Sequence, residues 1–315
     1  MNFNKLPLDS RLIDVPPPEE SGYPDELAKY DDESSIREAF GAADRDFPDA
    51  LDIPESEMRE RAAYNDEHDL WAGSYIDRYT NQSPTHECTS HALRCVAEAC
   101  WNRQRRISLG GPEAGKRLDI SAKSASVWFS CLSIYCEANP REWGGANVQQ
   151  VCRIACDRGF LPDIVQPKDY GFKHTMAGTR GKGGVNQSGD NNGGPYPWPG
   201  WYRDDFRDSP DHWEDDDWRE TAKHFKPLEC VYPRDSHQYR CLLLHGYAIG
   251  IGRSGHSVPI IGMKWEGRRW IYPYYDSYDR LLYDSSAYYS GAYSILTMTQ
   301  PDDWDKPAGQ ASPGA

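Results

Sequence analysis

The 315-residue chain has no apolar run that approaches the length of a membrane span. Its first ten residues, MNFNKLPLDS, lack the apolar segment of a secretion signal. A Cys-x-x-Cys pair is also missing, which argues against a zinc ribbon or a redox motif. We therefore expect no signal peptide, no membrane partner, no metal and no other cofactor.

Positive charge is scarce. The chain has 35 Lys and Arg against 49 Asp and Glu, and its formal net charge is -14. Such a chain repels phosphate backbones, so we expect no nucleic-acid partner. The mean hydropathy of -0.81 indicates much surface and loop, but 38% hydrophobic and 12% aromatic residues suffice for a core.

Cysteine is present in an odd number and without the spacing of a disulfide framework. The nine cysteines are at positions 88, 95, 100, 131, 136, 152, 156, 230 and 241. Most lie among apolar residues in expected helices or strands. We predict free thiols and a reducing intracellular compartment, or a virion if a virus encodes the chain.

Composition divides the chain into three parts. Residues 1–66 are acidic and weakly periodic, and we expect an extended N-terminal arm with short helical pieces, one of them near 55–63. Residues 67–300 form the main domain, with a Gly-, Asn- and Pro-rich insertion over 163–226. Residues 301–315 are typical of a flexible tail. Partner chains that order the arm and the tail are a natural expectation.

Hydrophobic periodicity predicts helices in the first half of the domain and strands in the second. A helical stripe of apolar residues follows Cys88, and another spans 148–155 and stops at Gly159. Branched and aromatic residues predict strands over 228–233, 241–252, 256–264, 268–275 and 292–299. Helices before strands indicate an α+β protein with two lobes.

The segment NQSPTHECTSHALRC places Cys88 at the start of the first of these helices, six residues after Gln82. The positive end of a helix favours thiolate, which is the nucleophilic form of cysteine. A nucleophilic thiol also needs an imidazole and an acceptor that orients it. His256 opens one expected strand and Asp276 closes the next, so adjacent antiparallel strands would bring them together. Gln82 can donate to an oxyanion.

These segments, taken together and in this order, resemble the papain-like cysteine peptidases. NQSPTHECTSHA is similar to the glutamine-to-cysteine segment of the family, and REWGGANVQQ to its Gly-Gly stretch and following helix. GHSVPIIGM resembles the strand that carries the catalytic histidine, and YPYYDSYD the strand that ends in Asn-Ser-Trp. The likeness covers residues 68–300, with the insertion lengthening the distance from cysteine to histidine.

The resemblance implies a two-lobe fold, with the cysteine on a helical lobe and the histidine on an antiparallel β lobe. It implies that Cys88 is the nucleophile, that His256 is the general base and acid, and that Asp276 replaces the orienting asparagine. Gln82 would complete the oxyanion hole. Gly144 and Gly145 would bind the backbone of an extended peptide or protein substrate.

Other functions remain open. Thr89 and Tyr278 stand where the family has tryptophans, and Glu87 puts negative charge beside the thiol. These departures favour a catalytically weak or inactive structural component of a larger assembly, such as a virus particle. The same residues also serve non-peptide amidases and acyl transferases. A metal held by His86, Cys88 and His91 is the least favoured alternative, because a matching ligand pair is lacking.

Overall fold

The computed structural model describes residues 47–76, 88–108, 129, 134, 148–160, 222–253, 256–277, 280–285 and 291–299. The helical elements are η3 (Asp49–Leu51), α3 (Met58–His68), η4 (Ala72–Tyr75), α4 (Cys88–Ser108), α6 (Val148–Arg158) and α9 (Ser236–Leu244). The strands are β1 (Pro227–Val231), β2 (Ile249–Arg253), β3 (His256–Ile260), β4 (Lys264–Glu266), β5 (Arg269–Asp276), β6 (Arg280–Asp284) and β7 (Ser294–Met298). The described strands all pair antiparallel, so the chain is an α+β protein.

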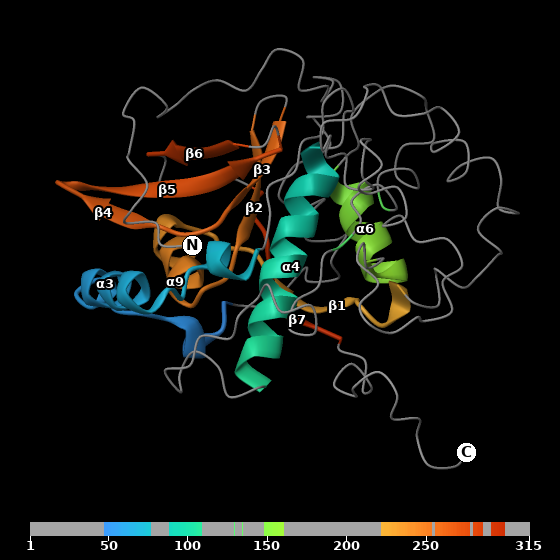
Figure 1. The fold of residues 1–315 in the computed structure, drawn as a ribbon, viewed down its shortest axis with the longest axis horizontal. Helices are drawn as coiled ribbons and strands as arrows, with labels where there is room; N and C mark the ends of the chain where they lie inside the picture. Colours follow the sequence, from blue (N-terminus) through green and yellow to red (C-terminus); the bar gives the residue numbers. More distant parts are fainter. Residues whose placement is uncertain are drawn as a thin grey trace, which may run out of the picture.

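Helix α4 is the centre of the molecule. It stands between the larger sheet and α6, and it also contacts β7 and η4 (Figure 1). Every residue from 88 to 102 is buried, as expected for a helix covered on all sides. The predicted stripe of Leu93, Val96, Ala97, Cys100 and Trp101 lies entirely in the core.

Helix α6 follows the prediction closely. Its buried residues are Val148, Val151, Cys152 and Ala155, which form one face. Gly159 ends the helix with φ 85° and donates its N–H to the carbonyl of Ala155 at 2.9 Å. A Cβ at Gly159 would clash with the backbone carbonyl of Ala222, so both the dihedral angle and the packing require glycine.

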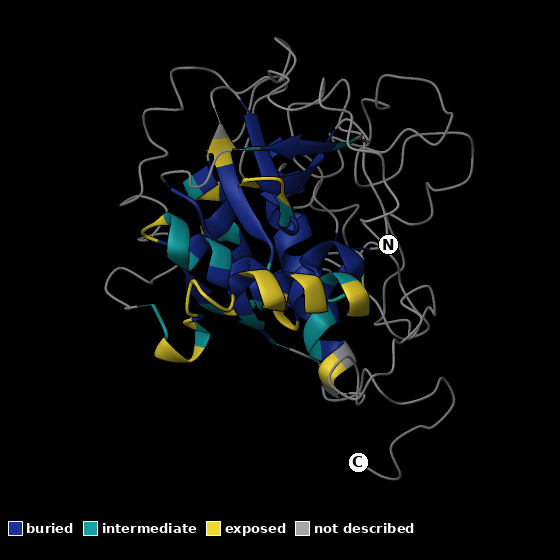
Figure 2. Ribbon diagram, turned by 90° about the vertical axis from the view of Figure 1, so that its left-hand side faces the viewer, coloured by how far each residue is buried: buried dark blue, intermediate teal, exposed yellow. Residues whose placement is uncertain are grey.

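The larger sheet has the strand order β2-β3-β5-β4, and β6 pairs with β5. β3 and β5 meet through the pair Ile260↔Tyr274 and through a 3.0 Å bond from Ile261 N–H to the carbonyl of Pro273. β1 and β7 form a separate two-stranded sheet. Figure 2 shows the buried residues concentrated in the strands and in the helices against them.

The predicted strand over 241–252 is wrong in its first part. Residues up to Leu244 belong to α9, and only Ile249–Arg253 form a strand. The Asp235 side chain caps α9 by accepting from Gln238 N–H at 2.8 Å. A short apolar run is compatible with a buried helix or a buried strand, and this cap decides for the helix. The strand predicted over 256–264 is divided into β3 and β4, and β6 was not predicted.

The N-terminal segment packs against the domain from Phe47 onwards. The boundary predicted between residues 66 and 67 falls inside α3, and Ile53, Met58 and Ala62 belong to the core. Helix α3 lies against α9 and β4.

Most of the predicted arm and insertion, and the whole tail at 301–315, lie outside the described residues. Of the helices that are described, none combines the length and apolarity needed to cross a membrane.

Candidate active site

Cys88, the predicted nucleophile, is the first residue of α4 and is fully buried. Helix α4 packs directly against β3, which begins at His256. The thiol of Cys88 lies near enough to the imidazole of His256 to raise the pKa of that imidazole. The central helix and the larger sheet therefore bring these two residues together across 168 positions of sequence, the difference between 256 and 88.

Asp276 is the last residue of β5, and its carboxylate lies against the same imidazole. His256 Nε2 and Asp276 Oδ1 are 3.1 Å apart, and each side chain is 3% exposed. Because β3 and β5 run antiparallel, the start of one strand and the end of the other meet at one end of the sheet. With Nε2 facing Asp276, Nδ1 is the ring nitrogen that remains for the thiol.

The charges around His256 favour its protonated form. Burial by itself lowers the pKa of this histidine, but the hydrogen bond to Asp276, the charge of that carboxylate and the proximity of Cys88 together outweigh burial. The net effect raises the pKa from 6.5 to about 9. At neutral pH the site therefore favours an imidazolium at His256, beside the Asp276 carboxylate and the Cys88 side chain.

The segment that precedes α4 is anchored to the sheet beside this site. Gly73 N–H donates to the carbonyl of Ile261 at 3.0 Å, just beyond the end of β3. The indole N–H of Trp71 donates to Asp66 at 2.7 Å, and its side chain lies against Gly262, where a Cβ would be in van der Waals contact with it. Asn102 of α4 donates to the carbonyl of Tyr75 at 2.8 Å. These contacts hold η4, α4 and β3 in one arrangement.

A buried ion pair fixes the next turns of α4. Arg94 Nη1 lies 3.6 Å from Glu98 Oε1, and both side chains are fully buried. Glu98 Oε1 also accepts from the backbone N–H of Phe129 at 2.7 Å. The Glu98 carboxylate therefore ties α4 to the backbone of Phe129.

Several predicted residues lie outside the described part of the chain, namely Gln82, Gly144 and Gly145, together with His86, Glu87 and Tyr278. His91 is described and is buried within α4. Seven cysteines fall within the described residues, and all of them are free thiols. Among the residues that the structure describes, it therefore brings together Cys88, His256 and Asp276 from the predicted set.

Sequence reasoning missed a second cluster, formed by Asp52, His237 and Cys241. The spacing of His237 and Cys241 places them one turn apart only if the segment is a helix, whereas a strand, which was predicted for Cys241, would separate them by about 13 Å. The capping signal at Asp235 could have revealed that helix.

The Cys88 site has the elements of nucleophilic catalysis: a thiol, an imidazole near it, and a carboxylate that holds the imidazole. Such a set can form and hydrolyse a thioester, which is the chemistry of peptidases, amidases and acyl transferases. Comparisons with protein-family models, curated proteins and solved structures each found no match.

Proposed function

We propose that this protein is a cysteine-type peptidase of papain-like architecture, with α4 in the helical lobe and His256 in the β lobe. The observation that carries the proposal is the meeting of Cys88, His256 and Asp276 at the junction of α4 with the sheet. A cysteine that begins a central helix and a histidine that begins a strand of the facing sheet suit this architecture. Seven free thiols suit a reducing intracellular compartment or a virion.

The geometry supports a sequence of proton transfers through His256. The imidazole takes the proton of Cys88, and the thiolate attacks the carbonyl carbon of the scissile peptide. The tetrahedral intermediate collapses to a thioester as His256 gives its proton to the leaving amine. A water molecule, deprotonated by His256, then attacks the thioester and releases a carboxylic acid and the Cys88 thiol.

Asp276 contributes by orientation and charge. Its carboxylate accepts from one ring N–H of His256, so the other ring nitrogen is directed at the thiol. The negative charge also stabilises the imidazolium that forms with the thiolate. From the family resemblance, Gln82 and the Cys88 backbone N–H would bind the oxyanion, and Gly144 and Gly145 would bind an extended substrate.

Labelling with a thiol-reactive peptidyl probe, such as an epoxysuccinyl peptide, tests this function. We expect wild-type protein to incorporate one probe, and peptide mapping to place it on Cys88. Cys88→Ala should abolish labelling, and His256→Ala should slow it strongly. Cys230→Ala, which removes a buried thiol outside the site, is the matched control and should label normally. Labelling that persists in Cys88→Ala would contradict the proposal.

A catalytically silent structural protein is the second candidate, and the burial of the site favours it. Cys88 is 0% exposed, and His256 and Asp276 are each 3% exposed, so a substrate must first displace whatever covers the thiol. The structural function is supported if the probe labels Cys88 of the folded protein no faster than it labels the buried Cys230, and if neither peptides nor proteins are cleaved. Probe incorporation well above that level supports the enzyme.

A further inference from the structure

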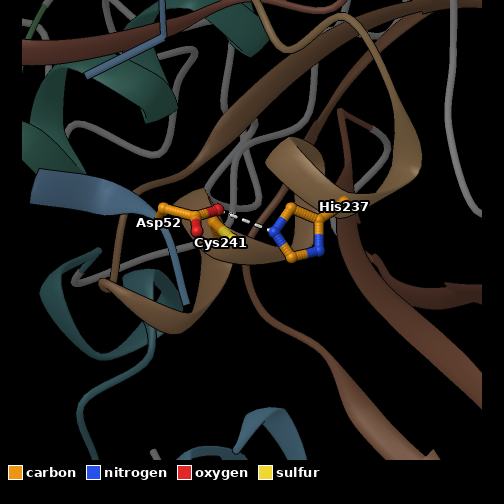
Figure 3. Close-up of side chains that lie close together, drawn as sticks. All are labelled: Asp52, His237 and Cys241. Carbon is orange, nitrogen blue, oxygen red and sulfur yellow. Dashed lines mark hydrogen bonds and ion pairs between the residues drawn. The ribbon is translucent and has the colours of Figure 1, made fainter. Parts of the chain in front are cut away.

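A second group of side chains converges at the contact between the N-terminal segment and α9. Asp52 comes from the residue after η3, and His237 and Cys241 come from α9. One carboxylate oxygen, one ring nitrogen and the sulfur all lie within 4.8 Å of one another. In Figure 3 the Asp52 carboxylate and the Cys241 sulfur lie on the same side of the His237 ring.

Local structure creates this convergence. His237 and Cys241 are four residues apart on a capped helix, so they lie one turn apart on the same face. Asp52 then approaches from a segment 185 residues earlier, and its Oδ1 lies 2.8 Å from His237 Nε2. Cys241 is fully buried, whereas the side chains of Asp52 and His237 are 59% and 35% exposed. A solvated ion can therefore reach the group from the Asp52 side.

We propose that Asp52, His237 and Cys241 form a binding site for a divalent cation of the zinc class. Carboxylate oxygen, imidazole nitrogen and thiolate sulfur are the ligands that zinc takes, and three protein ligands leave a fourth position for water. In a tetrahedral site, oxygen and nitrogen ligands lie about 3.3 Å apart. The present separation of Asp52 Oδ1 and His237 Nε2 is 2.8 Å, so this pair would have to open by about 0.5 Å, which the exposed side chain of Asp52 permits.

The groups beside His237 and Cys241 suit metal binding by these two residues. Glu55 Oε2 lies 3.6 Å from His237 Nδ1, the ring nitrogen that faces away from Asp52, and Arg240 holds that carboxylate at 2.8 Å. A carboxylate on the far nitrogen fixes the tautomer and orientation of a metal-binding histidine. The backbone N–H of Ile53 points at Cys241 Sγ at 3.4 Å and can stabilise a metal-bound thiolate.

The arrangement differs from the candidate active site in one decisive way. At His256 the Asp276 carboxylate occupies Nε2, so the nearby Cys88 thiol is left to the other ring nitrogen, an order that suits a proton relay. At His237 the carboxylate and the thiol both approach the same side of the ring. Atoms that converge on one point suit a shared cation rather than a relay of protons.

Metal binding would clamp the N-terminal segment to α9. That segment already contacts the helix region through the carbonyl of Leu51, which lies 3.2 Å from His245 Nε2, and through Ile53. The bond from Cys241 Sγ to the metal replaces the bond from sulfur to hydrogen, and the proton leaves to solvent. The ion would thus join segments that are far apart in the sequence and oppose their separation.

Cobalt(II) titration of the full-length protein, stripped with a chelator and kept reduced with a phosphine, tests the proposal. We expect one equivalent to bind, with a thiolate-to-cobalt charge-transfer band and the intense visible bands of a tetrahedral ion. Cys241→Ser should abolish the charge-transfer band. His237→Gln and Asp52→Asn should each weaken cobalt binding by about tenfold or more.

Matched controls are available among the exposed residues. His224→Gln and Asp49→Asn change an exposed histidine and an exposed aspartate outside the cluster, and both should bind cobalt like wild type. Glu55→Gln should weaken binding more than Glu57→Gln, because only Glu55 lies beside the His237 ring.

Zinc should also raise the melting temperature of the wild-type protein and leave that of His237→Gln unchanged. Because His237 and Asp52 are partly exposed, these variants should fold even if Cys241→Ser does not. Absence of a charge-transfer band in wild type would overturn the proposal. So would a band that survives Cys241→Ser and disappears in Cys88→Ser. Neither outcome depends on whether Cys88 is catalytic.

Discussion

His256 and Asp276 share a hydrogen bond of 3.1 Å between Nε2 and Oδ1, although they lie 20 positions apart and on different strands. Both side chains are almost completely buried, so water screens their interaction weakly. Together with Cys88, the carboxylate raises the pKa of the imidazole to about 9 despite the opposing effect of burial. The orientation and the charge state of His256 both depend on this contact.

Substitution of Asp276 should separate orientation from charge. Asp276→Ala removes the acceptor of the ring N–H, and we expect Cys88-dependent turnover to fall by about 10²–10⁴-fold. Asp276→Asn retains an amide oxygen that can accept from the ring, so its loss should be much smaller. Steady-state kinetics on a peptide that wild type cleaves and Cys88→Ala does not would measure both.

The ranking of the two Asp276 variants decides the role of this residue. An equal loss of turnover in Asp276→Asn and Asp276→Ala would mean that the negative charge matters more than the orientation. Unchanged turnover in both would exclude Asp276 as the third member of the set. Asp279, the next acid along the chain, would then be the candidate to test.

The raised pKa of His256 should appear in pH titrations. By NMR we expect its ring to remain protonated at pH 7 and to titrate near pH 9. In Asp276→Asn the titration should move down towards 6.5, because one of the two groups that raise the pKa has lost its charge. A wild-type midpoint below pH 7 would contradict the ion-pair interpretation of the site.

The same shift predicts how stability changes with pH. A group whose pKa is higher in the folded state binds its proton more tightly there, so its contribution is complete below about pH 6.5 and is lost as pH rises through about 9. A rise from 6.5 to about 9 is worth on the order of 3 kcal/mol. Urea unfolding from pH 6 to 10 should show a steeper loss for wild type than for Asp276→Asn.

Two glycines of β2 provide a matched test of packing. A Cβ at Gly250 would overlap the ring of Tyr293, which is buried and bonded to Gly250 through two backbone hydrogen bonds of 2.8 and 3.0 Å. Gly250→Ala should therefore lower the free energy of unfolding by about 1–3 kcal/mol. A Cβ at Gly252 meets nothing within 4 Å, so Gly252→Ala should change it by less than about 0.5 kcal/mol. Equal effects in urea unfolding would show that Tyr293 can move aside.

Sequence patterns predicted the elements whose periodicity is unambiguous. Helices α4 and α6 bury the faces expected from their apolar spacing, and Gly159 ends α6 as predicted. The meeting of His256 with Asp276 was also predictable, because two antiparallel strands joined by a short turn bring their outer ends together. Gly267, with φ 61°, lies in that turn between β4 and β5.

Features that depend on distant contacts were not predictable in this way. The apolar run at Leu242–Leu244 would be buried as either a helix or a strand, and the cap at Asp235 fixes the helix. The cluster at His237 requires both that helix and a carboxylate from Asp52, 185 residues away. The segment before residue 66 is mostly charged, so its sequence resembles that of a free arm. Its few apolar residues, Ile53, Met58 and Ala62, nevertheless belong to the core.

Removal of one member of the buried ion pair between Arg94 and Glu98 should be costly. Arg94→Met removes the cation that lies 3.6 Å from the buried Glu98 carboxylate, and we expect a loss of about 3–5 kcal/mol in the free energy of unfolding. Arg153→Met, an exposed substitution on α6, is the matched control and should cost less than about 0.5 kcal/mol.

The double variant Arg94→Met with Glu98→Gln should recover part of the loss caused by Arg94→Met. Glutamine keeps an oxygen that can accept from the backbone N–H of Phe129, and the double variant removes both charges of the pair together. Urea unfolding of wild type, both single variants and the double variant would give the coupling between the two residues. Additive losses would mean that the two charges are stabilised separately, and that α4 is not held by this pair.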